Sequence, residues 1–220
     1  MKKLFTAIRA SDLEMVKQII EKKPELVNCV AKKPPKKDDG QSPLQVALKT
    51  GNTAIANYLL DMGADVNFIE DETCCNAWRT PVLHDAINCA VMSCRWNNDD
   101  KYMGFREFST KERAVEALGV LKRMLNMGAD VNALDSYGNS GLNRFALQAK
   151  QILPSYNYAE HSEASDRVFT DELHEDLKKV LQALKDAGAD PSYTAPNLGC
   201  SVSKFCSEGS ISVLFNEVFG

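Results

Sequence analysis

Few residues of this sequence are suited to acid–base or metal chemistry, and their spacing does not bring them together. Histidine occurs only at His84, His161 and His174. His174, Glu175 and Asp176 are expected on one helix, where adjacent residues point in different directions. The sequence also lacks zinc-protease, nucleophile-elbow, phosphate-loop and dinucleotide-binding motifs. We therefore predict no catalytic residue, no metal ligand and no cofactor.

The cysteines and acidic runs are equally weak candidates for a reactive site. Seven cysteines stand at positions 29, 74, 75, 89, 94, 200 and 206, with no C-x-x-C pair. This pattern is typical of reduced thiols rather than of a disulfide framework or a zinc site. The acidic runs at 70–72 and 99–100 lack the alternating spacing and the glycine of a calcium loop. A hydrolase or metal site in the longer connections is a remote alternative.

Composition and charge limit the classes of partner. The 220-residue chain is 44% hydrophobic and 25% charged, which is ordinary for a globular protein. Its formal net charge of −4 disfavours binding to the phosphate backbone of nucleic acids. No run of about eighteen apolar residues predicts a membrane span, and Arg9, Asp12 and Glu14 interrupt the N-terminal apolar stretch too early for a signal peptide. We expect a cytoplasmic monomer that binds neither nucleic acid nor membranes.

One tripeptide occurs three times and indicates a repeat. Gly-Ala-Asp stands at 63–65, 128–130 and 188–190, each time after an apolar helical stretch. A glycine after the last apolar turn is typical of a left-handed helix end, so we expect a positive φ at Gly63, Gly128 and Gly188. The aspartates of the same signature are Asp65, Asp130 and Asp190.

The segment 40–67 shows the repeat most clearly. Ser42 is expected to cap its first helix, and Pro43 to occupy the first turn. With its Gly-Ala-Asp-Val-Asn ending, this segment resembles the ankyrin repeat, whose first helix opens T-P-L-H-x-A. A similar helix start with one extra residue follows at Thr80, Pro81 and His84. The resemblance implies a structural hydrogen-bonding role for this histidine.

The resemblance implies an all-α ankyrin-repeat solenoid of about five helix pairs, in a single domain over residues 1–220. Its units are expected at 1–39, 40–77, 78–135, 136–195 and 196–220. The triplets lie 65 and then 60 residues apart, well above the roughly 33 residues of one repeat, and we find no further helix-start motif in the excess. We therefore expect lengthened helical hairpins in the third and fourth repeats, packed side by side opposite the turns. Their aromatic residues would close that lobe's own core or form an exposed patch.

The turns between units are expected to project as fingers beside a concave face, at 28–41, 66–79, 133–139 and 192–199. The first finger is basic and the second acidic, which suits either solvated loops or a charged rim around a groove. The resemblance implies a non-catalytic protein–protein interaction module; a narrower alternative is an inhibitor or immunity-type protein that blocks one enzyme or toxin. The candidate partner-binding residues are Phe68, Glu70, Asp71, Trp78, Tyr137 and Tyr193.

Overall fold

A computed structural model describes residues 1–33, 35–100 and 102–220 of the chain. These residues form ten α-helices, two short 3-10 helices and two antiparallel ladders of two strands each. The α-helices are α1 (Lys2–Arg9), α2 (Leu13–Lys22), α3 (Pro43–Lys49), α4 (Thr53–Asp61), α5 (Val82–Met92), α6 (Lys111–Asn126), α7 (Gly141–Ala149), α8 (Asp171–Asp186), α9 (Val202–Phe205) and α10 (Ser210–Phe219). The 3-10 helices are η1 (Pro24–Asn28) and η2 (Lys36–Asp38), and the strands are β1 (Asn97–Asp100), β2 (Gly104–Glu107), β3 (Tyr156–Asn157) and β4 (Ser162–Glu163).

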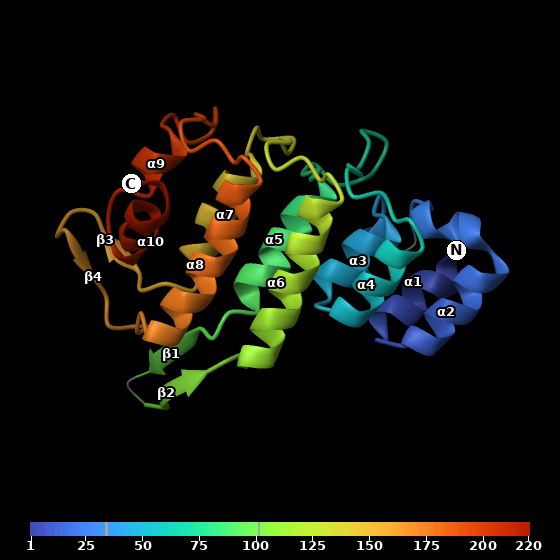
Figure 1. Cartoon of the computed structure of the whole chain (residues 1–220), viewed down its shortest axis with the longest axis horizontal. Helices are drawn as coiled ribbons and strands as arrows, with labels where there is room; N and C mark the ends of the chain where they lie inside the picture. Colours follow the sequence, from blue (N-terminus) through green and yellow to red (C-terminus); the bar gives the residue numbers. More distant parts are fainter. Residues whose placement is uncertain (34, 101) are drawn as a thin grey trace.

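The helices stack side by side along the long axis of the molecule (Figure 1). The odd-numbered helices form one row, in which α1 contacts α3, α3 contacts α5, α5 contacts α7, and α7 contacts α9. The even-numbered helices form a second row with the same order of contacts from α2 to α10. One hydrophobic cluster runs between the rows from Leu4 to Val218. The chain is thus an all-α repeat fold in which each helix pair buries its apolar faces against its neighbours.

Local sequence determines where several of these helices begin and end. Ser42 Oγ accepts a hydrogen bond from the Gln45 N–H at 3.2 Å, and Gln45 Oε1 accepts one from the Ser42 N–H at 3.1 Å. This reciprocal capping box starts α3 with proline in its first turn. At the helix ends, φ is +84° at Gly63, +90° at Gly128 and +86° at Gly188. The predicted left-handed glycines are confirmed.

The start of α5 differs from the one that the Thr80-Pro81 motif predicts. Pro81 occupies the N-cap position, and no side chain caps the helix. Thr80 precedes the N-cap residue by one position, because this helix start has one residue more than the one at Ser42, and its side chain does not cap the first turn. The Thr80 backbone N–H instead donates to Glu70 Oε2 at 2.7 Å. A long-range carboxylate contact therefore holds the chain just before this helix, where a local cap was expected.

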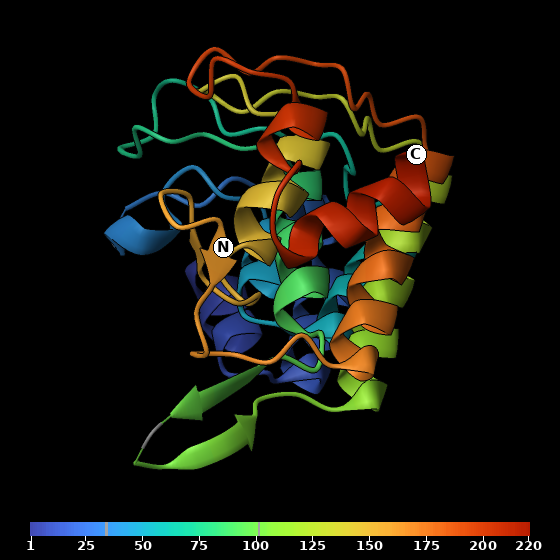
Figure 2. The ribbon, with the colours of Figure 1, turned by 90° about the vertical axis from the view of Figure 1, so that its left-hand side faces the viewer.

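The two insertions differ from the expected helical hairpins. After α5 the chain forms an antiparallel ribbon of β1 and β2, and after α7 it forms the short ladder of β3 and β4. The ribbon projects from the end of α5 and α6 that lies opposite the finger loops (Figures 1 and 2). The asparagines and aspartates of β1 compete for backbone hydrogen bonds in a helix, which accounts for the extended conformation. Only the second helices are long, with α6 and α8 each spanning 16 residues from a threonine cap.

The two insertions contact each other through paired polar groups. The Asn97 side chain donates to the Val168 carbonyl and accepts from the Val168 N–H, both at 2.8 Å. Arg95 donates to the two carboxylate oxygens of Asp176 on α8 at 2.9 and 2.8 Å. Because Asn97 and Asp176 are buried, these contacts fix the insertions against the helices.

The aromatic residues of the insertions have two different environments. Trp96 is partly buried and stacks on Phe108 with ring centroids 4.3 Å apart. Phe105 is 53% exposed and Tyr102 is 90% exposed, near the tip of the β1–β2 ribbon. One aromatic pair therefore closes the base of the ribbon, whereas Phe105 and Tyr102 near its tip are mostly exposed.

Candidate functional site

The fingers rest on a ladder of asparagine side chains that joins successive helix pairs. Each asparagine donates from its side-chain amide to the carbonyl of the next Gly-Ala-Asp glycine and accepts from the backbone N–H of the aspartate in that triplet. The distances lie between 2.8 and 3.1 Å at all three steps. The steps run from Asn28 to Gly63 and Asp65, from Asn67 to Gly128 and Asp130, and from Asn132 to Gly188 and Asp190. The first three fingers are therefore each fixed near their start to the neighbouring helix pair.

Asp39 joins the first finger to the second. Its carboxylate accepts from the backbone N–H groups of Cys75 and Lys33, each at 2.8 Å. Its carbonyl accepts from the Asn76 side chain at 3.2 Å. The hydrogen bonds from Cys75 and Lys33 lower the pKa of Asp39. The first finger is thus held by buried acidic groups at its base, although the lysines at 32, 33, 36 and 37 give it a basic outer surface.

The second and third fingers are joined by two sets of hydrogen bonds. The Ser136 N–H donates to the Arg79 carbonyl at 2.9 Å, and the Arg79 N–H donates to Ser136 Oγ at 3.1 Å. Beside this pair, Trp78 Nε1–H donates to Asp135 Oδ2 at 2.9 Å. The second finger thus cannot move independently of the third without breaking several contacts.

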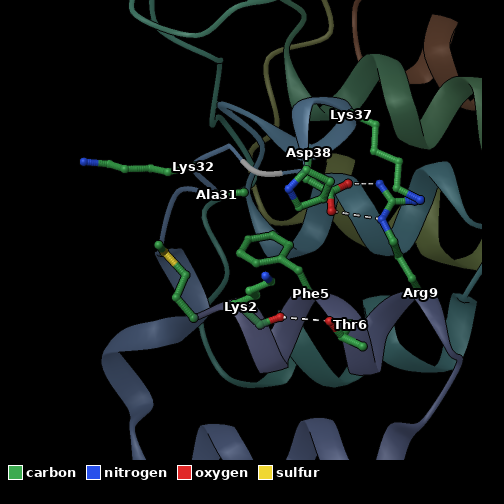
Figure 3. A pocket seen from close by; sticks show the side chains of 10 residues that line it. Lys2, Phe5, Thr6, Arg9, Ala31, Lys32, Lys37 and Asp38 are labelled. Atoms are coloured by element: carbon green, nitrogen blue, oxygen red, sulfur yellow. Dashed lines mark hydrogen bonds and ion pairs between the residues drawn. The ribbon is translucent and has the colours of Figure 1, made fainter.

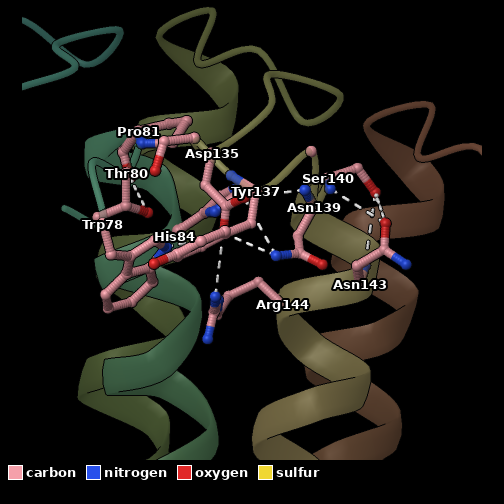
Figure 4. Close-up of polar contacts among 12 residues, drawn as sticks. Trp78, Thr80, Pro81, His84, Asp135, Tyr137, Asn139, Ser140, Asn143 and Arg144 are labelled. Atoms are coloured by element: carbon pink, nitrogen blue, oxygen red, sulfur yellow. Dashed lines mark hydrogen bonds and ion pairs between the residues drawn. The ribbon is translucent and has the colours of Figure 1, made fainter. Parts of the chain in front are cut away.

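Asp135 is the centre of this junction (Figure 4). Its buried carboxylate accepts from Trp78, the backbone and side chain of Asn139, and the Tyr137 N–H, and forms an ion pair with Arg144 at 3.2 Å. Burial would raise the pKa of Asp135, but the hydrogen bonds from Asn139, Trp78 and Tyr137 outweigh it, so the pKa is lowered. The Arg144 guanidinium also lies 4.6 Å from the Trp78 ring centroid.

The third and fourth fingers are in close contact as well. The Tyr193 hydroxyl donates to the Gly138 carbonyl at 2.8 Å. Gly138 has a φ of +79°, and a Cβ added there would lie 2.9 Å from Pro196 Cδ. This position therefore suits glycine both for its backbone conformation and for the approach of the fourth finger.

Glu70 lies beneath the second finger, and its predicted exposure to a partner is wrong. The residue is 3% exposed, and besides the Thr80 N–H it faces the Lys49 ammonium at 3.7 Å. Lys49 also lies 3.9 Å from Asp85 Oδ2, which accepts from Gln45 Nε2 at 3.3 Å. Since a buried charge needs partners, the carboxylate turns inward to the lysine and the Thr80 amide. Glu70 thus positions the finger.

Burial dominates the electrostatics of Asp85. It raises the pKa of this carboxyl to about 7; the positive charge of Lys49 opposes the shift, and the nearby Glu70 adds to it. A cavity of about 370 Å³ opens beside this cluster between α3 and α5, with Trp78 and Arg113 among its lining residues. Asp85 therefore lies in the wall of this cavity, where it binds a proton more tightly than an exposed aspartate does.

His84 lies at the same junction and is fully buried. Its Nε2 lies 3.1 Å from the Ala133 carbonyl oxygen at the start of the third finger. Burial, with a further contribution from the Arg144 charge, lowers the pKa of His84 to about 4. The neutral ring thus donates to the backbone of the next finger, a geometry that suits a structural role.

The other predicted partner-binding residues differ in how much surface they offer. Tyr137 is 53% exposed at the third finger. Asp71 is exposed, but its carboxylate accepts from the Thr73 N–H at 2.7 Å and so closes its own turn. Trp78 and Tyr193 are half-buried by the contacts above, and Phe68 packs against the core. Tyr137 is therefore the predicted aromatic residue with most of its side chain available to a partner.

Sequence reasoning missed Asp39, Asp135 and the asparagine ladder. The ladder had a readable signal, since Val-Asn recurs at 27–28, 66–67 and 131–132. The contacts of Asp39 and Asp135 to neighbouring fingers had none, because their donors Cys75 and Trp78 lie 36 and 57 residues away. Only folding brings those donors together.

The histidines, cysteines and acidic residues of the described chain have separate environments. Within residues 1–33, 35–100 and 102–220, no group of three or more His, Cys, Asp or Glu side chains is placed to hold a metal ion. A hydrogen bond with the Asp39 carboxylate raises the pKa of Cys75, the opposite of what a reactive thiolate needs. His161 and His174 contact different glutamates, Glu208 and Glu217. No helix in the described part of the chain is long and apolar enough to cross a membrane.

Stacked helix pairs with joined, projecting turns define the class of helical-repeat proteins. Within that class, residues 3–94 match the family model described as ankyrin repeats (3 copies). This segment, which covers less than half of the chain, is therefore identified as ankyrin repeats; repeats of this kind are generally protein–protein interaction modules and are typically non-enzymatic. No curated protein matches the chain.

Proposed function

We propose that this chain is a non-catalytic interaction module that binds a partner protein through its four fingers and the adjoining concave face. The observation that carries this proposal is the continuous set of hydrogen bonds between neighbouring fingers, through Asp39, Ser136, Asp135 and Tyr193. Because these contacts order the fingers before a partner arrives, binding costs little conformational entropy.

The proposed face combines an exposed aromatic anchor with exposed apolar residues and a charged group. Tyr137 supplies the anchor, and Ile69 and Leu134 on the second and third fingers are each 44% exposed. Trp78 and Tyr193 act by positioning these fingers, and Asp71 contributes charge. Aromatic anchors bordered by polar groups are typical of protein-recognition surfaces.

We further propose that the whole chain, residues 1–220, is one domain of five units with the boundaries 1–39, 40–77, 78–135, 136–195 and 196–220. The asparagine ladder supports this proposal, because its last step joins Asn132 to Gly188, beyond the residues that match the family model.

Affinity capture with two matched tyrosine variants tests the binding face. The intact chain and its Tyr137→Ala and Tyr102→Ala variants would be immobilised, and the proteins retained by each compared by mass spectrometry. We expect Tyr137→Ala to lose at least 10-fold in affinity for the retained partner, because truncating a central aromatic anchor costs about 2 kcal/mol or more. Tyr102, which is 90% exposed on the β1–β2 ribbon, controls for loss of an exposed tyrosine elsewhere.

The outcome separates the finger face from the insertion lobe. Equal retention by Tyr137→Ala and the unmodified chain, with loss in Tyr102→Ala, would contradict the finger face and favour the ribbon. The unfolding midpoint in urea should stay the same in all three proteins, so that a loss of binding cannot be attributed to unfolding. One tightly held enzyme would favour the inhibitor alternative over a scaffold.

A further inference from the structure

A second concave feature lies at the N-terminal end of the stack, between α1 and the first finger (Figure 3). This cavity of about 430 Å³ is within the usual range for ligand pockets. Its inner wall is apolar and includes Phe5, Ala31 and Pro35. The Phe5 ring points from α1 toward the finger segment that carries Ala31 and Asp38. An apolar side chain of a partner could thus lose its contact with water here.

The rim of the same cavity is cationic. Lys2, Lys32 and Lys37 line it and are exposed. Asp38 is the one carboxylate among the described lining residues, and it is already paired with Arg9, whose Nε lies 3.0 Å from Asp38 Oδ2. No carboxylate of the described chain lies within 4.0 Å of the three lysine ammonium groups.

This local charge opposes that of the rest of the chain. Residues 1–41 contain ten Lys and Arg against six Asp and Glu, although the whole chain has a formal net charge of −4. Long-range attraction would therefore direct an acidic ligand to this end of the array.

We propose that this pocket binds an acidic peptide segment of the partner protein. One bulky apolar side chain of the segment enters the cavity against Phe5, and its flanking carboxylates lie against Lys2, Lys32 and Lys37. The proposal rests on the proposed function and adds the chemistry of the partner to it.

The shape of the pocket favours a peptide over other anions. Inorganic phosphate has no apolar group to cover the Phe5 wall, and a flat bilayer surface cannot enter a concave cavity. A carboxylate-rich peptide with a protruding apolar residue can both cover the apolar wall and pair with the lysines of the rim.

Fluorescence anisotropy with labelled peptides on the intact chain tests this assignment. The probes are nonapeptides rich in Asp and Glu with Leu, Phe, Met or Trp at the centre, their central-Ala analogues, and analogues with Lys in place of the acids. We expect saturable binding of at least one acidic peptide with a bulky centre in 50 mM salt. The central-Ala analogue should bind at least 5-fold more weakly, and the basic peptides should not bind.

Two sets of protein variants locate the binding site. The double variant Lys32→Glu/Lys37→Glu should weaken peptide binding at least 10-fold. Thr6→Trp should also weaken it, because Thr6 lines the cavity and is exposed, so that a tryptophan side chain there would fill part of the cavity. The double variant Lys22→Glu/Lys23→Glu makes the same charge change at exposed positions outside the pocket and should bind within 2-fold of the unmodified chain.

Several results would overturn the proposal. These are no binding of any acidic peptide at 1 mM, equal loss in both double variants, or binding of only inorganic phosphate, a single-stranded oligonucleotide or phosphatidylserine vesicles through Lys32 and Lys37. The Tyr137→Ala variant should bind the peptide normally. Partner capture that depends on Tyr137 but not on Lys32 and Lys37 would refute the pocket alone, whereas capture that depends on neither would refute the proposed function.

Discussion

Replacing the buried acid Asp85 with asparagine should change how stability depends on pH. Asp85 is 2% exposed, and burial raises its pKa from 3.8 to about 7. The folded state therefore holds this proton more tightly than the unfolded state does. The resulting stabilisation is complete below about pH 4 and is lost as the pH rises through about 7.

The size of this effect follows from the shift in pKa. A difference of about three pKa units, at about 1.4 kcal/mol each, sets an upper limit of roughly 4 kcal/mol on the change in the free energy of unfolding. Asparagine keeps an acceptor for Gln45 Nε2 but cannot ionise. We therefore expect the free energy of unfolding of Asp85→Asn, relative to that of the unmodified protein, to rise by about 2–4 kcal/mol as the pH increases from 4.5 to 8.

Urea unfolding followed by circular dichroism at several pH values would measure this difference. Taking the variant minus the unmodified protein cancels the titration of the other carboxylates, and Asp186→Asn on the exposed side of α8 is the control. A second variant, Lys49→Met, should move the loss of stability to higher pH, because Lys49 opposes the pKa shift of Asp85. A stability difference constant within about 0.5 kcal/mol from pH 4.5 to 8 would refute the raised pKa of the buried Asp85.

Two further predictions concern the repeat geometry. Gly128→Val should lower the free energy of unfolding by roughly 1–3 kcal/mol in a urea titration. The cause is the φ of +90° alone, since a Cβ there meets no atom within 4 Å. The control Gly119→Ala, in the ordinary helical backbone of α6, should be neutral or stabilising in the same titration. Asn67→Ala removes the hydrogen bonds to the Gly128 carbonyl and the Asp130 N–H, and thermal unfolding should show a loss of about 1–2 kcal/mol in stability. A similar loss for Asn197→Ala, at an exposed position outside the ladder, would refute the stabilising role of the ladder.

The features that the sequence predicted correctly are those decided by neighbours along the chain. The Ser42 cap and the positive φ at the Gly-Ala-Asp glycines depend on groups only a few residues away, and both can be read directly from the residue types. Gly141 begins α7 at the position that Pro43 occupies in α3, and the absence of proline there has a tertiary cause. Its N–H donates to the Val131 carbonyl at 3.1 Å, and a Cβ there would lie 2.6 Å from that oxygen. Proline lacks the N–H proton that makes this hydrogen bond, and its ring would collide with the Val131 carbonyl.

The sequence by itself thus determined the Ser42 cap, the helix ends at the Gly-Ala-Asp glycines, the all-α repeat and the order of the fingers. The tertiary structure alone decided that Glu70 turns inward, that Asp135 collects donors from two fingers, and that the polar segment after α5 forms a ribbon. The physical reason is that local capping needs only the next turn of the chain. The orientation of a charged side chain depends instead on which distant donors and which low-dielectric surroundings folding places around it.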